Sequence, residues 1–402
     1  MDVTVTRCTS VDELRRAFVI SHYLGNVVDE ERAERFARNL PVERMLAAWD
    51  GEEVVGGAGA FPVELSVPGG RRVAAGGVTI VGVLPTHRRR GVLTALMRAQ
   101  LDDLRARGEP VACLWASEGT IYGRYGYGVA SLQVEFALAR DRTAFAAPAE
   151  PYGRIRFVSR DEALAAFPAV YERVLGQRPG MFARTEAWWD EQTLPEKLRF
   201  GGPAHERVLL EVDGAPEGYA VYQVHAAWAH GSSSGHVQVL EALGATPAAT
   251  RTVWRYLLDL DWTSQIRADK LPVDHPLFLL LAEPRRLQAE VTDCLWVRLV
   301  DVGEALSARG YAGAEEIVFE VRDAFCPWNE GRWRLADGRA ERTDAAPALA
   351  LDAAALGSAY LGAFTFQELA EAFRVEELEP GAIARADTVF RADRAPWCPE
   401  IF

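Results

Sequence analysis

The sequence lacks several features that would assign a protein to a membrane, to a secretory route or to a metal. No apolar run approaches the ~20 residues of a membrane-spanning helix. The first residues, Met1–Val5, have neither the basic nor the apolar region of a secretory signal. The five cysteines form no CxxC pair, which favours free thiols in a reducing cytosol, and the seven histidines show no ligand spacing. We therefore expect a cytoplasmic protein without a membrane span or a bound metal.

An excess of positive charge is also missing. Lys and Arg number 44 against 57 Asp and Glu, and the net charge of −13 argues against nucleic-acid binding, which needs a broad basic face. An acidic surface attracts polycationic ligands at long range, although many cytosolic proteins are acidic for solubility alone. With 402 residues, 49% apolar and 25% charged, the chain is expected to form two or three globular domains.

The most informative segment that is present covers residues 78–93. A β-branched run ends at Pro85-Thr86, a basic turn follows at Arg88–Gly91, and apolar residues then recur with the period of a helix at Val92, Leu93, Leu96, Met97, Leu101 and Leu104. A strand that enters a helix through such a turn directs free N–H groups and the positive end of the helix dipole at one point, which suits a phosphate. Gly91 permits a positive φ and a close approach of the ligand. Taken alone, such a turn is as often structural.

Two strings in the first third of the chain carry a resemblance. Arg-Arg-Arg-Gly-Val-Leu at 88–93 resembles the coenzyme A pyrophosphate loop of the GCN5-related N-acetyltransferases (GNAT), although Leu93 replaces a small residue. Ile-Tyr-Gly-Arg-Tyr-Gly-Tyr at 121–127 resembles their Tyr-x-x-x-Gly-Phe segment. A closer match is to the Eis-type (enhanced intracellular survival) acetyltransferases, which share Pro-Thr-His-Arg-Arg-Arg-Gly, Ala-Ser-Glu-Gly-x-Ile-Tyr-Gly-Arg and, at 356–362, Leu-Gly-Ser-x-Tyr-Leu-Gly. The likeness covers essentially the whole chain.

The resemblance implies a mixed α/β (α+β) fold, with tandem GNAT folds followed by a C-terminal domain like the sterol carrier proteins. The expected domains are residues 1–150, which bind acetyl-CoA, residues 151–291, which lack the coenzyme A loop, and residues 292–402, which deliver the C-terminal carboxylate. An internal repeat supports the tandem arrangement. Residues 237–258 repeat the strand, turn and helix pattern of residues 78–97, with Thr246–Ala249 in place of the basic turn. The resemblance also implies a homohexamer.

Acetyl transfer requires that acetyl-CoA be held and its thioester carbonyl polarised. We expect the turn and the first helical residues to hold the pyrophosphate through N–H groups and arginine charge, with the set Arg88, Arg89, Arg90, Gly91, Val92, Leu93 and Thr94. The end of the preceding strand, Val81-Gly82-Val83, is expected to splay, to offer an N–H to the carbonyl oxygen and to pair with the pantetheine amides, and Gly82 suits a β-bulge there. Ser117 and Glu118 match family positions at the coenzyme A site. Read by themselves, they would be a helix N-cap pair.

The thiolate leaving group needs a proton donor. A phenol with a pKa of ~10 is protonated at neutral pH and can donate to a thiolate. Tyr122, Tyr125 and Tyr127 lie close together, and their spacing alone does not choose among them. The resemblance assigns the role to Tyr122, and aromatic packing is the expected role of the other two.

The attacking amine needs a proton acceptor, and no side chain stands out by spacing among the candidates Asp29, Glu30, Glu31, Glu118 and Glu400. The resemblance implies that the base is the chain's C-terminal carboxylate, here on Phe402. The ending at 395–402 is apolar and stiffened by proline, which supports docking, and burial without chemistry is the alternative. Family members commonly carry a carboxylate just before the terminal Phe. Here Ile401 stands there and Glu400, a candidate substrate contact, comes one position earlier.

We therefore expect an acetyl-CoA-dependent N-acetyltransferase that modifies primary amines of a cationic small molecule. The resemblance implies aminoglycosides, acetylated at one or several positions. Phe36 and Ile80 match positions that line the amine pocket, although each alone reads as apolar filler. Two other functions stay open at this point, a protein-lysine acetyltransferase and a non-catalytic acyl-CoA- or lipid-binding protein.

Overall fold

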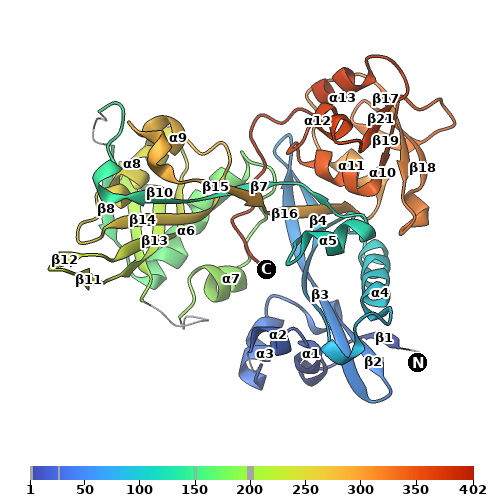
Figure 1. The fold of residues 1–402 in the computed structure, drawn as a ribbon, viewed down its shortest axis with the longest axis horizontal. Coiled ribbons are helices and arrows are strands. Elements are labelled where there is room, and N and C mark those ends of the chain that lie inside the picture. The colour runs from blue at the N-terminus through green and yellow to red at the C-terminus, as the bar shows by residue number, and fades with distance from the viewer. Residues whose placement is uncertain (1–2, 26–27, 149, 151, 197–202) are drawn as a thin grey trace. The chain divides into compact units, whose positions relative to one another are not determined.

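The computed structural model describes residues 3–25, 28–148, 150, 152–196 and 203–402. Its contacts divide the chain into two compact units. The first comprises Met1–Ser131, Cys294–Pro396 and Glu400–Phe402, and the second comprises Leu132–Asp293 and Trp397–Pro399. Figure 1 labels many of the elements of both units, numbered in chain order. No helix in the described part of the chain is long and apolar enough to cross a membrane.

The first unit contains a sheet of seven strands among its described residues. In spatial order these are β1 (Thr4–Arg7), β2 (Met45–Asp50), β3 (Glu53–Val67), β4 (Arg71–Val83), β5 (Val111–Trp115), β16 (Leu295–Leu299) and β6 (Gly128–Val129). Only β4 and β5 pair in parallel, and the other neighbours are antiparallel. β3 and β4 read as near-continuous apolar runs because both of their faces are covered.

Helices cover the two faces of this sheet at its centre. The helices before β5 are α1 (Val11–Ala17), α2 (Ser21–Leu24), α3 (Glu30–Ala37) and α4 (Val92–Ala106). A Cβ added to Gly56 would meet Val92 and Leu96 of α4, whereas one added to Gly57 would lie 1.9 Å from the Ala17 carbonyl oxygen. Successive strand residues face opposite sides. α4 and α1 therefore lie on opposite faces, and the α1 side is too close for any side chain at residue 57.

The C-terminal part of the first unit builds a smaller sheet. Its order is β19 (Arg339–Arg342), β18 (Gly331–Ala336), β17 (Ile317–Arg322), β20 (Leu349–Asp352) and β21 (Val375–Glu377). It is accompanied by the helices α10 (Val302–Ala308), α11 (Ala353–Tyr360), α12 (Phe366–Glu371) and α13 (Ala382–Phe390). Three buried aromatic rings form its centre, with Phe390 edge-on to both Phe319 and Phe366.

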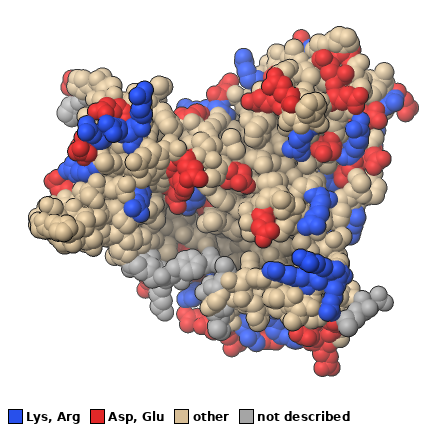
Figure 2. Space-filling view, in the orientation of Figure 1, with Lys and Arg blue, Asp and Glu red and all other residues tan. Residues whose placement is uncertain are grey.

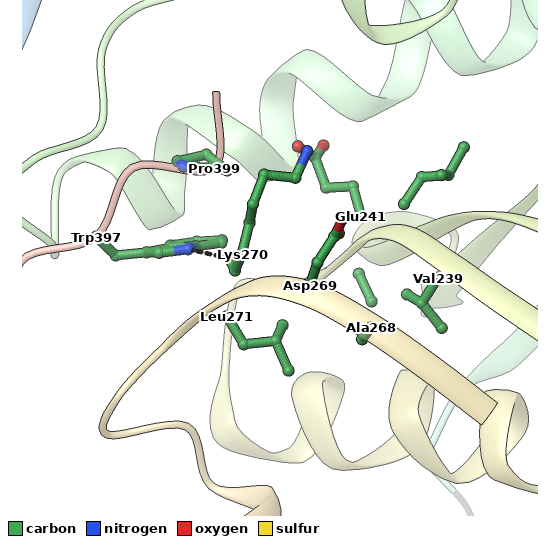
Figure 3. A pocket seen from close by; sticks show the side chains of 10 residues that line it. Val239, Glu241, Ala268, Asp269, Lys270, Leu271, Trp397 and Pro399 are labelled. Atoms are coloured by element: carbon green, nitrogen blue, oxygen red, sulfur yellow. Dashed lines mark hydrogen bonds between the residues drawn. The ribbon is translucent and has the colours of Figure 1, made fainter. Parts of the chain in front are cut away.

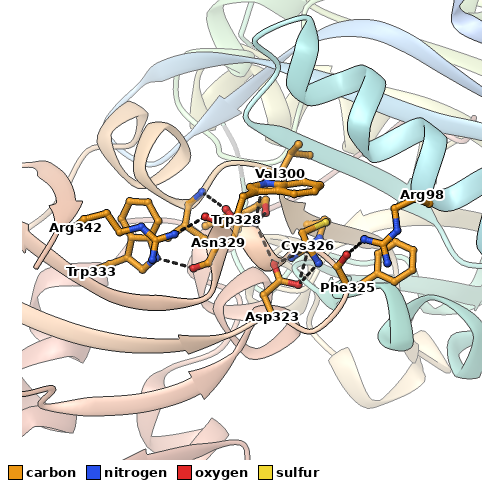
Figure 4. Close-up of polar contacts among 12 residues, drawn as sticks. Arg98, Val300, Asp323, Phe325, Cys326, Trp328, Asn329, Trp333 and Arg342 are labelled. Carbon is orange, nitrogen blue, oxygen red and sulfur yellow. Dashed lines mark hydrogen bonds and ion pairs between the residues drawn. The ribbon is translucent and has the colours of Figure 1, made fainter. Parts of the chain in front are cut away.

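A buried polar network connects this smaller sheet to the larger one, as Figure 4 shows. Asp323 accepts from Arg298 of β16 in an ion pair whose two side chains are 0% and 1% exposed. It also accepts from the Cys326 backbone N–H and the Asn329 amide. On α4, Arg98 donates to the Phe325 carbonyl oxygen and lies 3.9 Å from its ring centroid. Paired in this way, the charges avoid the penalty of an isolated buried ion.

The second unit repeats the sheet design. Its described strands run in the order β15 (Glu290–Asp293), β7 (Leu132–Ala139), β14 (Gln265–Pro272), β13 (His236–Gly244), β10 (Ala215–His225), β9 (Glu206–Val212) and β8 (Arg154–Phe157). Its two long helices are α6 (Arg160–Leu175), which begins with a capping box at Ser159, and α8 (Pro247–Leu258). The second unit also contains the short helices α7 (Glu186–Trp188) and α9 (Leu277–Leu280) and a hairpin of Trp228–Ala229 with Ser232–Ser233. The first unit has one further short helix, α5 (Gly119–Tyr122).

The units part at different residues from those that the sequence suggests. The expected first domain, residues 1–150, includes residues 132–139, yet β7 pairs with β14 and β15 inside the second sheet. In turn β16, which follows the second unit, inserts between β5 and β6. The second unit thus begins after Ser131 and its main segment ends before Cys294. The sequence suggested boundaries at 150/151 and 291/292, and residue 151 lies outside the described residues. An alternating strand pattern shows that a strand forms and says nothing of which sheet receives it.

Candidate active site

The pairing of β4 with β5 ends halfway along β4. Their parallel register covers only Ala75 to Gly77, opposite Val111 to Cys113. β4 then continues to Val83, while β5 stays paired with β16 through Trp115. The last six residues of β4 therefore have no paired residue on the edge that faces β5. Their free backbone groups can pair with an extended ligand, as an added strand would.

β4 contains a bulge within this unpaired stretch. Thr79 is opposite Gly59 and Gly82 is opposite Gly57, so that Ile80 and Val81 together face Ala58 alone. Ile80 has a φ of +56°, which is a strained value for a β-branched residue. The left-handed residue is thus Ile80 and not Gly82, where the sequence suggested the bulge. Gly82 instead allows a close approach, because a Cβ there would lie 3.2 Å from Val19 and 3.3 Å from the Ile20 nitrogen.

The turn before α4 leaves the start of the helix open. Gly91 is the N-cap with a φ of +83° and provides no side-chain cap, and the first intrahelical bond runs from Ala95 N–H to the Gly91 carbonyl oxygen at 3.0 Å. The N–H groups of Val92, Leu93 and Thr94 therefore lack helical partners. A Cβ on Gly91 would meet nothing within 4 Å. This is the arrangement of an anion site at a helix start.

Arginine side chains surround this helix start. Arg88, Arg89 and Arg90 are all exposed, and basic side chains gather in Figure 2 where Figure 1 draws the chain entering α4. The Arg88 Nε donates to the Tyr23 hydroxyl at 3.0 Å, its guanidinium lies 4.8 Å from the centre of the Tyr23 ring, and Tyr23 donates to the Val83 carbonyl oxygen. Tyr23 therefore ties the arginine to the end of β4. Nothing in the local sequence pattern pointed to Tyr23.

The three tyrosines after β5 have different surroundings. Tyr122 packs with Val78 and Met97 in the core on the α4 side of the sheet and is 6% exposed. Burial raises the pKa of its phenol, and a hydrogen bond with Ser117 offsets this only in part. The Tyr125 hydroxyl lies 3.3 Å from the Thr94 Oγ1. Tyr127 is fully buried, and its hydroxyl has no hydrogen-bond partner among the described residues.

Ser117 and Glu118 do not behave as the helix cap that their types alone suggest. Glu118 occupies the N-cap position of α5, but its side chain makes no cap hydrogen bond. Both side chains are exposed. Ser117 instead interacts with the Tyr122 hydroxyl. The pair is thus available to a ligand beside Tyr122.

The last residue of the chain lies on the other face of β4. A Cβ on Gly76 would meet Leu104 of α4, whereas one on Gly77 would lie 3.4 Å from the Phe402 ring. Phe402 is edge-on to Phe61 at 6.4 Å, and Phe61 in turn packs on Phe36 at 5.3 Å. Phe402 thus touches β4 at the residue where its pairing with β5 ends, on the face opposite to the one that Tyr122 packs against.

The remaining predicted residues also fall near this point. Phe36 and Ile80 are half-buried, Phe36 within the aromatic group of Phe61 and Ile80 in the bulge of β4. In the tail, Glu400 is 6% exposed and Ile401 is 63% exposed. Among the described residues, no group of His, Cys, Asp and Glu is arranged to hold a metal ion.

Comparison with known proteins places the chain among acetyltransferases. Residues 7–130 and 180–299 each match a model of an acetyltransferase (GNAT) domain, and residues 302–399 match a sterol carrier protein domain. An N-acetyltransferase of Streptomyces avermitilis is 42% identical, with 97% of this chain and 96% of that protein covered. The N-acetyltransferase Eis of Mycobacterium tuberculosis is 34% identical, with 97% and 98% covered. The crystal structure of Eis1 from Mycobacterium abscessus matches with a TM-score of 0.88 at 34% identity, and the match covers 99% of this chain and 100% of that one. The predicted fold class is confirmed.

We predict that Gly91→Ala weakens coenzyme A binding about tenfold, which corresponds to ~1.4 kcal/mol. The added Cβ meets no atom within 4 Å, so the loss would come from the left-handed φ of +83°, which an alanine relaxes by moving the N–H donors. Gly108→Ala is the matched control, since Gly108 follows the same helix with a φ of +72° and equally open space. Titration calorimetry measures the affinity. Equal losses of affinity in both variants would contradict an anion site at Gly91.

Proposed function

Because this chain belongs to the Eis-type N-acetyltransferases of the GNAT superfamily, we propose that it transfers the acetyl group of acetyl-CoA to primary amines of polycationic small molecules, aminoglycosides among them. The observation that carries the proposal is the position of Phe402. It lies against Gly77, where β4 leaves β5, with Tyr122 packed on the opposite face. An acid and a base are then available from the two sides of one strand.

The open start of α4 suits the pyrophosphate of acetyl-CoA. Three free N–H groups, the dipole of a helix of 15 residues and the exposed arginines 88–90 all favour an anion there. The unpaired edge of β4 offers backbone groups to the pantetheine amides. The bulge leaves Val81 without a register partner on β3, so that its N–H can bind the thioester oxygen and stabilise the negative charge that develops on it.

The transfer moves two protons. As the amine nitrogen bonds to the thioester carbon, the Phe402 carboxylate takes a proton from the nitrogen. The carbon–sulfur bond then breaks, and the Tyr122 hydroxyl gives its proton to the sulfur. An α-carboxylate is ionised at neutral pH. Burial raises the pKa of Tyr122 and keeps its phenol protonated, as a donor requires.

The amine side of the site is aromatic. Phe36 and Phe61 pack beside Phe402, and the half-buried Ile80 lies in the bulge of β4. These groups give shape and exclude water, whereas the net charge of −13 attracts a polycation at long range. The cytoplasmic location remains a prediction from the composition, and the homohexamer remains a prediction from the resemblance. The five cysteines are buried and form no disulfide in the structure.

We predict that the chain with a native C-terminus releases coenzyme A faster with an aminoglycoside than without an amine. The physical reason is that a polycation is drawn to the acidic protein and offers unhindered primary amines. Thiol release from acetyl-CoA is measured with an aminoglycoside panel, a lysine-containing peptide and no amine. Faster turnover of the peptide would make the chain a protein-lysine acetyltransferase. No stimulation by any amine would favour an acyl-CoA- or lipid-binding protein.

We predict that one alanine added after Phe402 lowers kcat about 100-fold, because it displaces the carboxylate by ~3.5 Å from its working position. The affinity for acetyl-CoA should not change. Ile401→Ala is the matched control, since this side chain is 63% exposed and its loss leaves the carboxylate in place. Steady-state kinetics with a saturating amine decide the matter. Full activity of the extended chain would refute Phe402 as the base.

We predict that Tyr122→Phe lowers kcat at least about 100-fold, since it removes the proton donor while it keeps the ring. Tyr127→Phe is the matched control, because the Tyr127 hydroxyl is buried without a partner among the described residues. Its removal should preserve kcat and leave the melting temperature equal or higher. Turnover and calorimetric melting are measured for both. A loss of stability with preserved turnover in Tyr122→Phe would indicate a packing role.

A further inference from the structure

The second unit repeats the strand geometry that forms the site of the first. β13 and β14 pair in parallel from His236 and Gln265 as far as Val239 and Ala268, and the pairing then ends. Each strand has a register irregularity at that point. Leu240 is the extra residue in β13. In β14, Asp269 and Lys270 together face Glu135 alone, and Lys270 has a φ of +55°. The two strands therefore part as β4 and β5 do.

In this unit the gap between the strands is filled by the chain's own C-terminal segment. Figure 3 shows Trp397 and Pro399 against Lys270 and Leu271 of β14, with Glu241 of β13 on the far side. Together with the two strands they leave a cavity of only about 10 Å³. That volume holds a single water molecule at most, so no room remains for a pantetheine arm.

Trp397 is held there by more than apolar contact. Its indole N–H donates to the Lys270 carbonyl oxygen of the parted strand, and its backbone N–H donates to the Pro179 carbonyl oxygen at 2.8 Å. Gly180, with a φ of +93°, approaches so closely that a Cβ would lie 3.0 Å from the Trp397 backbone. The side chain is 5% exposed and belongs to the same buried cluster as Trp189 and Tyr219. This is a fitted site for one indole.

Polar groups complete the filling of the gap. The Glu241 carboxylate accepts from Arg184 at 2.9 Å and from the Tyr219 hydroxyl. Burial works to raise the pKa of Glu241, but Arg184, Tyr219 and Lys270 together outweigh it, and the pKa is lowered. The Arg184 guanidinium also lies 4.0 Å from the Tyr171 ring centroid. The Glu241 carboxylate is thus occupied by donors of the protein itself.

A protein side chain also occupies a backbone N–H group at the start of α8. Thr246 is its N-cap, and the hydroxyl accepts from the Ala249 N–H at 3.1 Å. In the first unit the N-cap Gly91 leaves the corresponding groups open. The second repeat has therefore lost the anion site and has filled the space beside it with protein.

We propose that this gap is a socket for the C-terminal segment, and that Trp397 is a positioning residue for the Phe402 carboxylate. The proposal rests on the proposed function of that carboxylate as the base. Five residues separate the indole from the chain end, so the anchor limits the reach of the carboxylate to ~17 Å. Cys398 is fully buried, and Pro399 has a fixed φ, which removes more of the tail's freedom. A chain end without such an anchor samples many positions and rarely the productive one.

The test is Trp397→Ala in the full-length chain, with kcat and the KM for acetyl-CoA measured separately. We expect kcat to fall about 100-fold, because a base displaced by about 1 Å already costs that much, while the KM stays the same. Trp397→Phe keeps a ring and loses the indole N–H, and we expect it to give an intermediate loss of kcat. This variant provides the test if Trp397→Ala folds poorly. Trp262→Ala is the control. Trp262 belongs to the same unit, is 76% exposed and should show no effect.

A double-variant cycle separates positioning from a general structural role. In a chain already extended by one alanine after Phe402, Trp397→Ala should add little further loss, because the base is already misplaced. Additive losses would overturn the proposal, as would full kcat in both Trp397 variants. If the extension itself had no effect, the proposed base would fail. If the extension were costly and the Trp397 variants were not, only the anchor would fail.

Discussion

The first unit's site depends on one constraint, which is that β4 stops pairing with β5 after Gly77. Had the pairing continued to Val83, the edge of β4 that faces β5 would be saturated and would offer no backbone group to a ligand. The end of pairing leaves free backbone groups on one edge. It also makes Gly77 the point that Phe402 touches on one face, with Tyr122 packed on the other. The bulge at Ile80 reinforces the divergence, and the left-handed φ there is strain of the kind that functional sites retain.

The second unit shows that the parted strands do not by themselves make an acetyl-CoA site. β13 and β14 part in the same way, yet Trp397 and the Arg184–Glu241 pair fill the gap, and Thr246 caps the following helix. What differs is the identity of a few side chains at the helix start and between the strands. An N-cap glycine leaves every N–H donor of the first turn open to a phosphate, whereas the Thr246 hydroxyl occupies one of them, the Ala249 N–H. The parted strands therefore provide a cavity, and local chemistry decides whether a ligand or the protein occupies it.

Sequence alone was informative where the signal is local. The basic turn, Gly91 and the apolar period of residues 92–104 predicted an open helix start after a strand, and the structure has α4 with that cap. The repeat at Thr246–Ala249 predicted the loss of the turn, and Thr246 indeed caps α8. The exchange of β7 and β16 between sheets was not predictable, because an apolar strand fits either sheet equally well. Tyr23 and Trp397 were also missed, since their roles depend on contacts with residues 60 and 127 positions away along the chain.

The tail illustrates how a shift of one residue changes chemistry without changing the fold. In an extended segment, neighbouring side chains point to opposite sides. Glu400 is 6% exposed and Ile401 is 63% exposed, so the acidic side chain of this ending lies inside and the apolar one faces outward. A chain with a carboxylate at 401 would instead present that charge to an approaching amine. In this protein the outward side of the tail attracts no cation. Under the proposed function, selection among amines would then depend on the aromatic shape of Phe36, Phe61 and Phe402 and on the field of the whole acidic protein.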